Sequence, residues 1–320
     1  MSFHFYGNTK ALQVLQQSIQ TGHLSHAYLF YGPAGVGKQT LAKQFAQAIF
    51  CQGENIPCGH CIPCQKMLKN IHPDFQELGG QNTKNSFHVR EVRAIRSDAY
   101  IRPNDGEAKV YLLNGVDNMS KEAANSLLKV LEEPPDNVVF LLTCPSRSAV
   151  LPTLVSRCVP IEIFPVTQPE CIQALQELSP DTTLEEITRA SQLCDGIIGK
   201  GLELLSDPEE IKASQTAFQI LESLSKGNEL AVVVALSPLE NSRPFTKKVL
   251  LFLSNLLRLA LQAKIKKISI LGLDDFIQKQ SIQSILKMAD TVETCIGMLE
   301  QNANLKLCVT WLSANLPYSI

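Results

Sequence analysis

A glycine-rich phosphate loop is the feature that most limits what this chain can fold into. The loop, Gly32–Lys38, directly follows a short apolar run, Ala27–Phe30. Such a loop joins a buried strand to a helix, and its backbone N–H groups and its lysine cradle phosphate groups. The helix that follows directs the positive end of its dipole at the same phosphates. The sequence therefore predicts an α/β domain with a phosphate site at the end of a strand.

The loop carries most, but not all, of the groups that a bound nucleotide needs. The pattern asks for Ser or Thr directly after the lysine, as a ligand of Mg²⁺. Gln39 stands there instead, and the next hydroxyl lies one residue further around the helix. A turn that merely joins strand to helix is the alternative. We therefore expect no Mg²⁺ site and leave ATP binding open, with these candidate residues for a degenerate nucleotide site: Gly32, Gly35, Gly37, Lys38 and Thr40.

A second strand lacks the acidic residues of a hydrolytic centre. An ATPase of this kind carries carboxylates at the end of a neighbouring strand, where they hold Mg²⁺ and orient water. The strand here, Val110–Leu113, is followed by Asn114 and Gly115. Asp117 lies further on, and we interpret it as an acid near the start of the next helix rather than a catalytic group. The sequence predicts an ATPase relative that has lost its own hydrolysis.

A cluster of cysteines predicts a metal site. Four thiols fall within a short insert: Cys51, Cys58, Cys61 and Cys64. Zn²⁺ prefers four tetrahedral soft ligands, and four thiolates leave no open position, so the site would be structural. Buried free thiols or a redox pair are the alternatives, and His60 and His72 could compete for one ligand position. Five other cysteines lack ligand spacing and are expected to be buried apolar residues: Cys144, Cys171, Cys194, Cys295 and Cys308.

Charge and hydropathy exclude two classes of protein. The formal net charge is −2 over 320 residues, so the chain is not a dedicated nucleic-acid coat, and DNA contact needs a local patch or a partner. No apolar run reaches the roughly 18 residues of a membrane span. The longest run, Val249–Ala263, is interrupted by Arg258 and is typical of a buried helix. The N-terminus lacks a signal peptide pattern. We expect a cytoplasmic protein.

The pattern of apolar residues divides the chain into three parts. Residues 1–164 alternate helices and buried strands, which favours a parallel sheet. Residues 165–207 form three short helical patterns, and residues 208–320 form long ones. The elements expected in the first part are helices at Asn8–Thr21, Gln39–Phe50, Val89–Ala99 and Lys121–Leu131, and strands at Ala27–Phe30, Phe75–Leu78, Lys109–Leu113, Val138–Thr143 and Val159–Phe164.

An arginine before the last strand is a further candidate. Ser156, Arg157 and Cys158 stand in a row there. An arginine in such a position is usually a solvated charge or part of a local ion pair. Beside a disabled phosphate site, it could instead act in trans and stabilise charge on the nucleotide of a neighbouring subunit.

These motifs together resemble bacterial clamp-loader subunits of the AAA+ class. The strings that carry the resemblance occur in one order: His26–Phe30, Gly32–Lys38, the four-cysteine insert, Asn125–Pro135 and Ser156–Cys158. The resemblance implies a RecA-like AAA+ domain with a zinc knuckle, a small helical lid and an all-α collar. Gly199 falls where an ATP-hydrolysing member would carry a nucleotide-sensing arginine. Together with Asn114 and Gly115, it favours the delta-prime type over the motor type.

The resemblance also implies a function and partners. A delta-prime subunit would be part of the DNA polymerase III holoenzyme, in a ring with motor (gamma or tau) and delta subunits that loads the sliding clamp onto primer–template DNA. Arg157, within the Ser156–Cys158 motif, would be the finger offered to the adjacent motor, and the four cysteines of the insert would bind zinc. The rivals are a motor-type or other AAA+ ATPase and a zinc-dependent nucleic-acid binder. Near-neutral charge and the lack of aromatic–basic interleaving around the cysteines weigh against the second.

Overall fold

The chain folds into two compact units. A computed structural model describes residues 3–79, 87, 89–227 and 229–316. Unit 1 comprises Met1–Cys171 and Gly196–Gly199, and unit 2 comprises Ile172–Asp195 and Lys200–Ile320. The expected boundary at 164/165 lies close to the end of the first stretch of unit 1. The boundary expected at 207/208 lies within unit 2, and the separation of a lid from a collar remains a prediction.

Unit 1 is built on a parallel sheet of five strands. The strands are β1 (Ala27–Tyr31), β2 (Phe75–Gly79), β3 (Lys109–Asn114), β4 (Val138–Cys144) and β5 (Val159–Glu162). Their order across the sheet is β2-β3-β4-β1-β5, and every pairing is parallel. β1 therefore lies inside the sheet, next to β4, and all carboxyl ends share one edge. Ligands of open α/β sheets bind along that edge.

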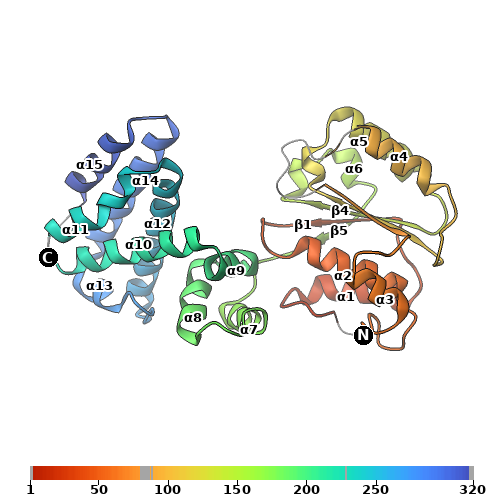
Figure 1. Cartoon of the computed structure of the whole chain (residues 1–320), viewed down its shortest axis with the longest axis horizontal. Coiled ribbons are helices and arrows are strands. Elements are labelled where there is room, and N and C mark those ends of the chain that lie inside the picture. The colour runs from red at the N-terminus through yellow and green to blue at the C-terminus, as the bar shows by residue number, and fades with distance from the viewer. Residues whose placement is uncertain (1–2, 80–86, 88, 228, 317–320) are drawn as a thin grey trace. The chain divides into compact units, whose positions relative to one another are not determined.

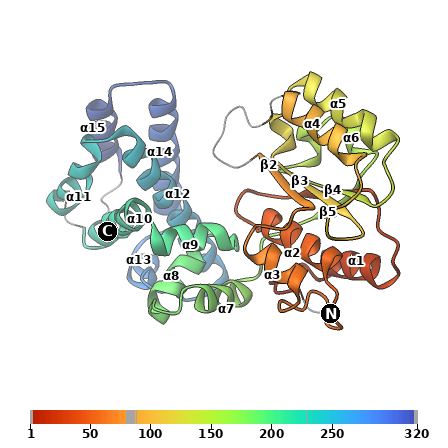
Figure 2. The same ribbon diagram turned by 45° about the vertical axis from the view of Figure 1, so that its right-hand side comes forward.

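Helices cover both faces of this sheet (Figures 1 and 2). One face packs against α4 (Val89–Ala99), α5 (Lys121–Glu132) and α6 (Pro152–Val155). The other packs against α1 (Thr9–Gln20), α2 (Lys38–Phe50) and α3 (Ile62–Leu68). Successive residues of the inner strands alternate between these two cores because side chains alternate across a strand. Burial on both faces explains why β3 and β4 are buried along their whole length.

The expected elements of unit 1 are all present, with ends that differ by one or two residues. The helix α3 inside the cysteine insert was not expected. It is only seven residues long, with Cys61 at its N-cap and a proline in its first turn. Short helices of this size are held by their tertiary surroundings rather than by their own periodicity. Met67, which is buried in the core beneath α2, anchors it.

Unit 2 is helical throughout its described residues. Its helices are α8 (Leu184–Leu193), α10 (Pro208–Ser225), α11 (Glu229–Leu236), α12 (Arg243–Lys266), α13 (Asp274–Lys279), α14 (Ile282–Glu300) and α15 (Leu305–Asn315). Two further helices, α7 (Gln168–Leu178) and α9 (Ile198–Ser206), have residues in both units. α12 lies between α10 and α14, so the long apolar run of the sequence is a packed helix. Among the described helices, none has the length and hydropathy needed to cross a membrane.

Candidate nucleotide and metal sites

The phosphate loop has the geometry that its sequence predicts. It connects β1 to α2, which begins at Lys38. Gly35 and Gly37 have φ of 83° and 93°, a region that residues with a side chain rarely adopt. The Lys38 Nζ donates to the carbonyl oxygens of Gly32 (2.7 Å) and Pro33 (2.8 Å). Burial lowers the pKa of Lys38, opposed by Cys144 and Asp117. The loop therefore joins strand to helix with glycines at positive φ, as its sequence predicts, and the Thr40 side chain is exposed on α2.

A hydrogen-bonded network occupies the positions where Mg²⁺ ligands are expected. The Glu77 Oε1 on β2 accepts from Gln39 Nε2 (2.5 Å) and from Asn114 Nδ2 (2.7 Å). Its second oxygen pairs with Lys43 Nζ on α2 at 2.8 Å. Thr143 at the end of β4 donates to Asn114 Oδ1 at 3.3 Å. The Glu77 carboxylate is thus satisfied by protein donors, and these bonds tie α2, β2 and β3 together.

Glu77 was missed by sequence reasoning, which treated its strand only as an element of the sheet. The only available signal was an acid next to the carboxyl end of a strand in a phosphate-loop domain. What brings it to the site is the pairing of β2 with β3, in which Glu77 lies opposite Leu112 and Gly79 opposite Asn114. That register is a tertiary feature and has no signature in the sequence.

The start of α9 touches the phosphate loop through a glycine. The Gly199 N–H donates to Gly35 O at 3.0 Å. A Cβ added at Gly199 would lie 2.7 Å from that oxygen and 2.9 Å from the Gly35 Cα. Any side chain there, including the sensing arginine of a motor subunit, would require the loop or the helix to shift. The close backbone contact therefore gives a packing reason for the glycine.

Asp117 lies near the start of the next helix, as expected, but it does not cap that helix. It lies in a short 3₁₀ turn, Val116–Asn118, and the N-cap of α5 is Ser120, whose side chain accepts from the Ala123 N–H. The Asp117 Oδ1 is buried without a hydrogen-bond partner among the described residues. Its charge raises the pKa of Lys38, and so it helps to keep the loop lysine protonated.

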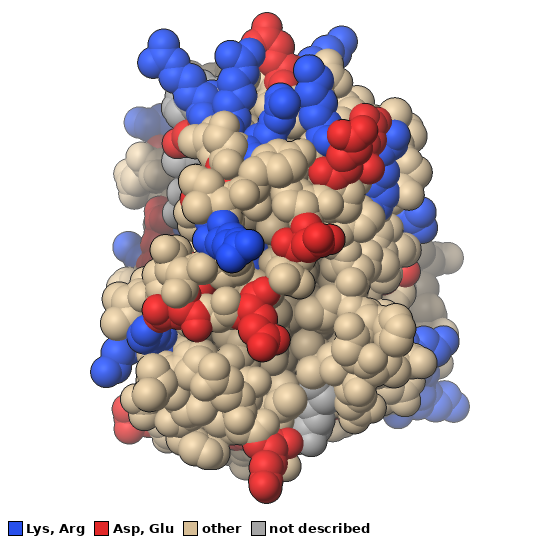
Figure 3. Space-filling view, turned by 90° about the vertical axis from the view of Figure 1, so that its right-hand side faces the viewer, with Lys and Arg blue, Asp and Glu red and all other residues tan. Residues whose placement is uncertain are grey.

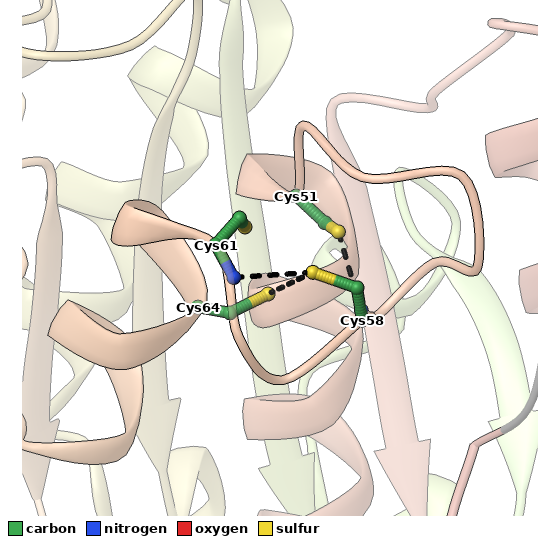
Figure 4. A group of neighbouring side chains, drawn as sticks. All are labelled: Cys51, Cys58, Cys61 and Cys64. Atoms are coloured by element: carbon green, nitrogen blue, oxygen red, sulfur yellow. Dashed lines mark hydrogen bonds between the residues drawn. The ribbon is translucent and has the colours of Figure 1, made fainter.

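The four cysteines of the insert converge on one point (Figure 4). Their four Sγ atoms all lie within 4.8 Å of one another: Cys51, Cys58, Cys61 and Cys64. The Cys58 and Cys64 Sγ atoms are 3.9 Å apart. A tetrahedral ion with Zn–S bonds of about 2.3 Å would place its sulfurs roughly 3.8 Å apart. The cluster could therefore hold a metal ion such as zinc.

Backbone donors around the cluster favour thiolates. The Cys51 sulfur accepts from the N–H groups of Gly53 (3.4 Å) and Cys58 (3.3 Å), and the Cys58 sulfur accepts from Cys61 N–H (3.3 Å). Hydrogen bonds from the backbone N–H groups of Cys61 and His60 lower the pKa of Cys58 to about 6. Burial raises the pKa of Cys64, which is fully enclosed, so the ligand set depends on a cation to ionise completely.

The two histidines are not ligands in this arrangement. His60 bonds its Nδ1 to the carbonyl oxygen of Cys58 and is exposed. His72 is buried and stacks on Phe50, with ring centroids 3.9 Å apart. None of the ten cysteines forms a disulfide, so the four cysteines of the insert are free thiols. The five cysteines without ligand spacing are buried as expected: Cys144, Cys171, Cys194, Cys295 and Cys308.

Arg157 forms the local ion pair that was the alternative to a role in trans. It follows α6 and Ser156, and its Nη2 lies 2.6 Å from Glu132 Oε1 at the end of α5. Its Nη1 donates to Thr153 O at 2.8 Å. The arginine side chain keeps 32% of its surface exposed and Glu132 keeps 50%. The neighbouring Cys158 is buried and faces the sheet core.

Comparison with known proteins places this architecture in a family. Residues 7–167 match the family described as "DNA polymerase III, delta subunit", and this is half of the chain. The chain belongs to the DNA polymerase III delta subunit family. The match covers the phosphate loop, the cysteine cluster and Arg157. It confirms the resemblance to clamp-loader proteins, which the sequence motifs predicted.

Relatives of this family member include both types of clamp-loader subunit. The chain is 40% identical over 137 residues to DNA polymerase III subunit delta' of Pseudomonas aeruginosa, which is 42% of each chain. It is 34% identical over 154 residues to subunit tau of Bacillus subtilis, covering 48% of this chain and 27% of tau. The chain thus spans about half or less of the length of these relatives. A solved gamma subunit-related protein of Thermotoga maritima shares 18% identity and the fold, with a TM-score of 0.50 over 94% of this chain and 97% of that one.

The Glu77 network yields a prediction for this delta-family chain. Asn114→Asp replaces a donor to Glu77 with a second carboxylate. We expect it to lower the free energy of unfolding by about 1–3 kcal/mol, because a buried donor is lost and like charges face each other. Denaturant unfolding checks this, with Asn125→Asp on the exposed face of α5 as control. Unchanged stability in Asn114→Asp, at a pH where Glu77 is ionised, would contradict the role given to the network.

Proposed function

We propose that the chain is the delta-prime, or stator, subunit of a DNA polymerase III clamp loader. In this role it hydrolyses no ATP and offers Arg157 to the nucleotide of an adjacent motor subunit. The observation that carries the proposal is the network at the phosphate loop. Two amides and one glycine replace the groups that hold metal and water, and Glu77 is already bonded to Gln39 and Asn114. Phosphoryl transfer depends on placing metal and water, so this site lacks what hydrolysis requires.

The exposure of Arg157 supports a role in trans. An ion pair between exposed side chains contributes only about 0–1 kcal/mol, so the contact with Glu132 is easily exchanged for another anion. The planar guanidinium matches the oxygens of a phosphate, and such charged hydrogen bonds are stronger than neutral ones. The local ion pair is therefore compatible with a finger that engages only when a neighbouring nucleotide is present.

A basic helix face supports contact with DNA through the assembled complex. Arg90, Arg93 and Arg96 are spaced three residues apart along α4, and all three are exposed. In the described part of the chain, no ion pair involves them. Figure 3 shows Lys and Arg side chains gathered at the end of the molecule where α4 and α5 lie in Figure 1. A cationic stripe of this kind fits the phosphate backbone of a primer–template duplex.

The metal proposed for the cysteine cluster is a structural zinc ion. Four thiolates fill a tetrahedral shell and leave no position for substrate. The ion would fasten the loop after α2 to α3, whose Cys64 and Met67 are buried. When bound, it supplies stability to this insert and takes no part in a reaction.

A motor-type subunit is the second candidate, and the similarity to tau together with the intact loop lysine favours it. The test is to purify the chain and measure phosphate release from ATP with primed DNA. We expect the isolated chain to release phosphate only at the background rate. We also expect it to co-elute with motor and delta subunits on size exclusion. Robust turnover by the isolated chain that Lys38→Ala abolishes would establish the motor type instead.

A further inference from the structure

The ion pair of Arg157 has a partner whose position the helix itself does not favour. Glu132 is the last residue of α5, and Glu133 is its C-cap. The carboxyl end of a helix carries partial negative charge, so two acids there oppose the helix dipole. Neither acid is buried, and helix stability gives no reason for them. Glu132 instead forms an ion pair with Arg157, in which Oε1 lies 2.6 Å from Nη2.

The two contacts of Arg157 hold its guanidinium against its own subunit. Nη2 faces Glu132 and Nη1 donates to Thr153 O on α6. Both terminal nitrogens are therefore engaged, and the positive charge is neutralised by a carboxylate. Any phosphate presented by a neighbouring subunit must displace Glu132 before it gains the full charge of the arginine. The carbonyl of Thr153 carries no charge, so Glu132 is the competitor.

We propose that Glu132 is a positioning residue that restrains the arginine finger. This proposal rests on the proposed function of Arg157 as a finger. In it, the ion pair with Glu132 holds Arg157 against its own subunit until the nucleotide of the adjacent subunit is brought close. The ion pair therefore lowers the rate of ATP hydrolysis at the neighbouring motor site until that nucleotide is close enough to displace Glu132. An exposed ion pair shifts the equilibrium between paired and unpaired Arg157 by no more than about fivefold. The expected effect is therefore a modest decrease in rate and not a complete inhibition.

The experiment uses the complex reconstituted with motor and delta subunits, assayed without DNA. Glu132→Gln removes the charge and keeps the size of the side chain. We expect it to raise kcat at the motor site that faces this subunit by about two- to fivefold, to raise kcat of the whole complex by less, and to leave KM unchanged, because an arginine finger acts on the transition state. Glu133→Gln is the matched control, since this neighbouring acid is also exposed and its side chain does not contact Arg157 in the described structure.

A double variant separates this proposal from the function it rests on. The double variant Glu132→Gln, Arg157→Ala should have the same kcat as Arg157→Ala alone, since Glu132 acts only through the arginine. If Arg157→Ala slows the complex but Glu132→Gln leaves kcat unchanged or lowers it, the restraint is wrong and the finger stands. If Arg157→Ala has no effect on the complex, the finger and its restraint are both wrong. Zinc content and elution volume of each variant confirm that it is folded.

Discussion

Replacing Cys61 and Cys64 by serine is expected to remove the metal from the chain, from one zinc per molecule to almost none. Two of the four converging sulfurs would be lost, and a hydroxyl is a poor ligand for Zn²⁺ in such a site. Structural zinc in small peptides contributes about 10–16 kcal/mol of binding free energy, so the insert should lose its order. The sheet should persist, because most residues of its two cores lie outside the cysteine insert. Elemental analysis and hydrogen exchange over residues 51–68 measure both effects.

Cys295→Ser is the control for this change. Cys295 is fully buried in unit 2 and is not part of the cluster, so its variant should keep the same metal content even if it loses stability. Metal binding should also weaken as the pH falls, since the thiols must lose their protons to coordinate. Unaltered zinc content in the double serine variant, or no metal in protein prepared without chelator, would exclude the four-cysteine site.

Arg157→Ala is expected to slow the site that receives this arginine by about a thousandfold or more, the range reported for fingers acting in trans. A ring has several motor sites and only one would lose its finger, so DNA-stimulated ATPase of the whole complex should fall less steeply. Stability of the isolated chain should change by no more than about 1–2 kcal/mol, because one exposed ion pair and one exposed hydrogen bond to Thr153 O are lost. Arg157→Lys should rescue poorly, since one ammonium cannot reproduce the planar fork.

The matched control is Arg189→Ala. Arg189 forms an exposed ion pair with Glu185, also at 2.6 Å, on α8 in unit 2. Arg189→Ala therefore removes an exposed ion pair of the same length and leaves the Ser156–Cys158 motif unchanged. If Arg157→Ala destabilises the isolated chain while ATPase per assembled ring stays normal, Arg157 serves only its local ion pair, and the finger is ruled out.

Much of the fold followed from local patterns. The strands β3 and β4 were predicted because both faces of a parallel strand are buried and their residues are therefore continuously apolar. The phosphate loop was predicted because glycines and a lysine in this order, directly after a buried strand, are typical of a phosphate-binding loop. The cysteine spacing predicted a cluster, and the structure brings all four sulfurs together. In each of these cases, the chemistry is set by neighbours in the sequence.

The partners of the site residues could not be predicted in the same way. Glu77 reaches Gln39 and Asn114 only because β2 pairs with β3 at one register. Glu132 meets Arg157 only because α5 and α6 end on the same side of the sheet. Helix α3 and the 3₁₀ turn that holds Asp117 are too short to have a periodicity of their own.

The order of residues alone shows which chemical groups are present: a phosphate loop, four closely spaced cysteines and an arginine before the last strand. It also shows that Asn114 and Gly115, not carboxylates, stand at the end of β3. Those are statements about residue types at short spacing, and local chemistry is enough to read them. Which distant groups form hydrogen bonds and ion pairs with one another depends on the folded arrangement of helices and strands. A hydrogen bond between Glu77 and Asn114 joins residues 37 positions apart, and such contacts arise from packing the helices and pairing the strands, which no short segment specifies.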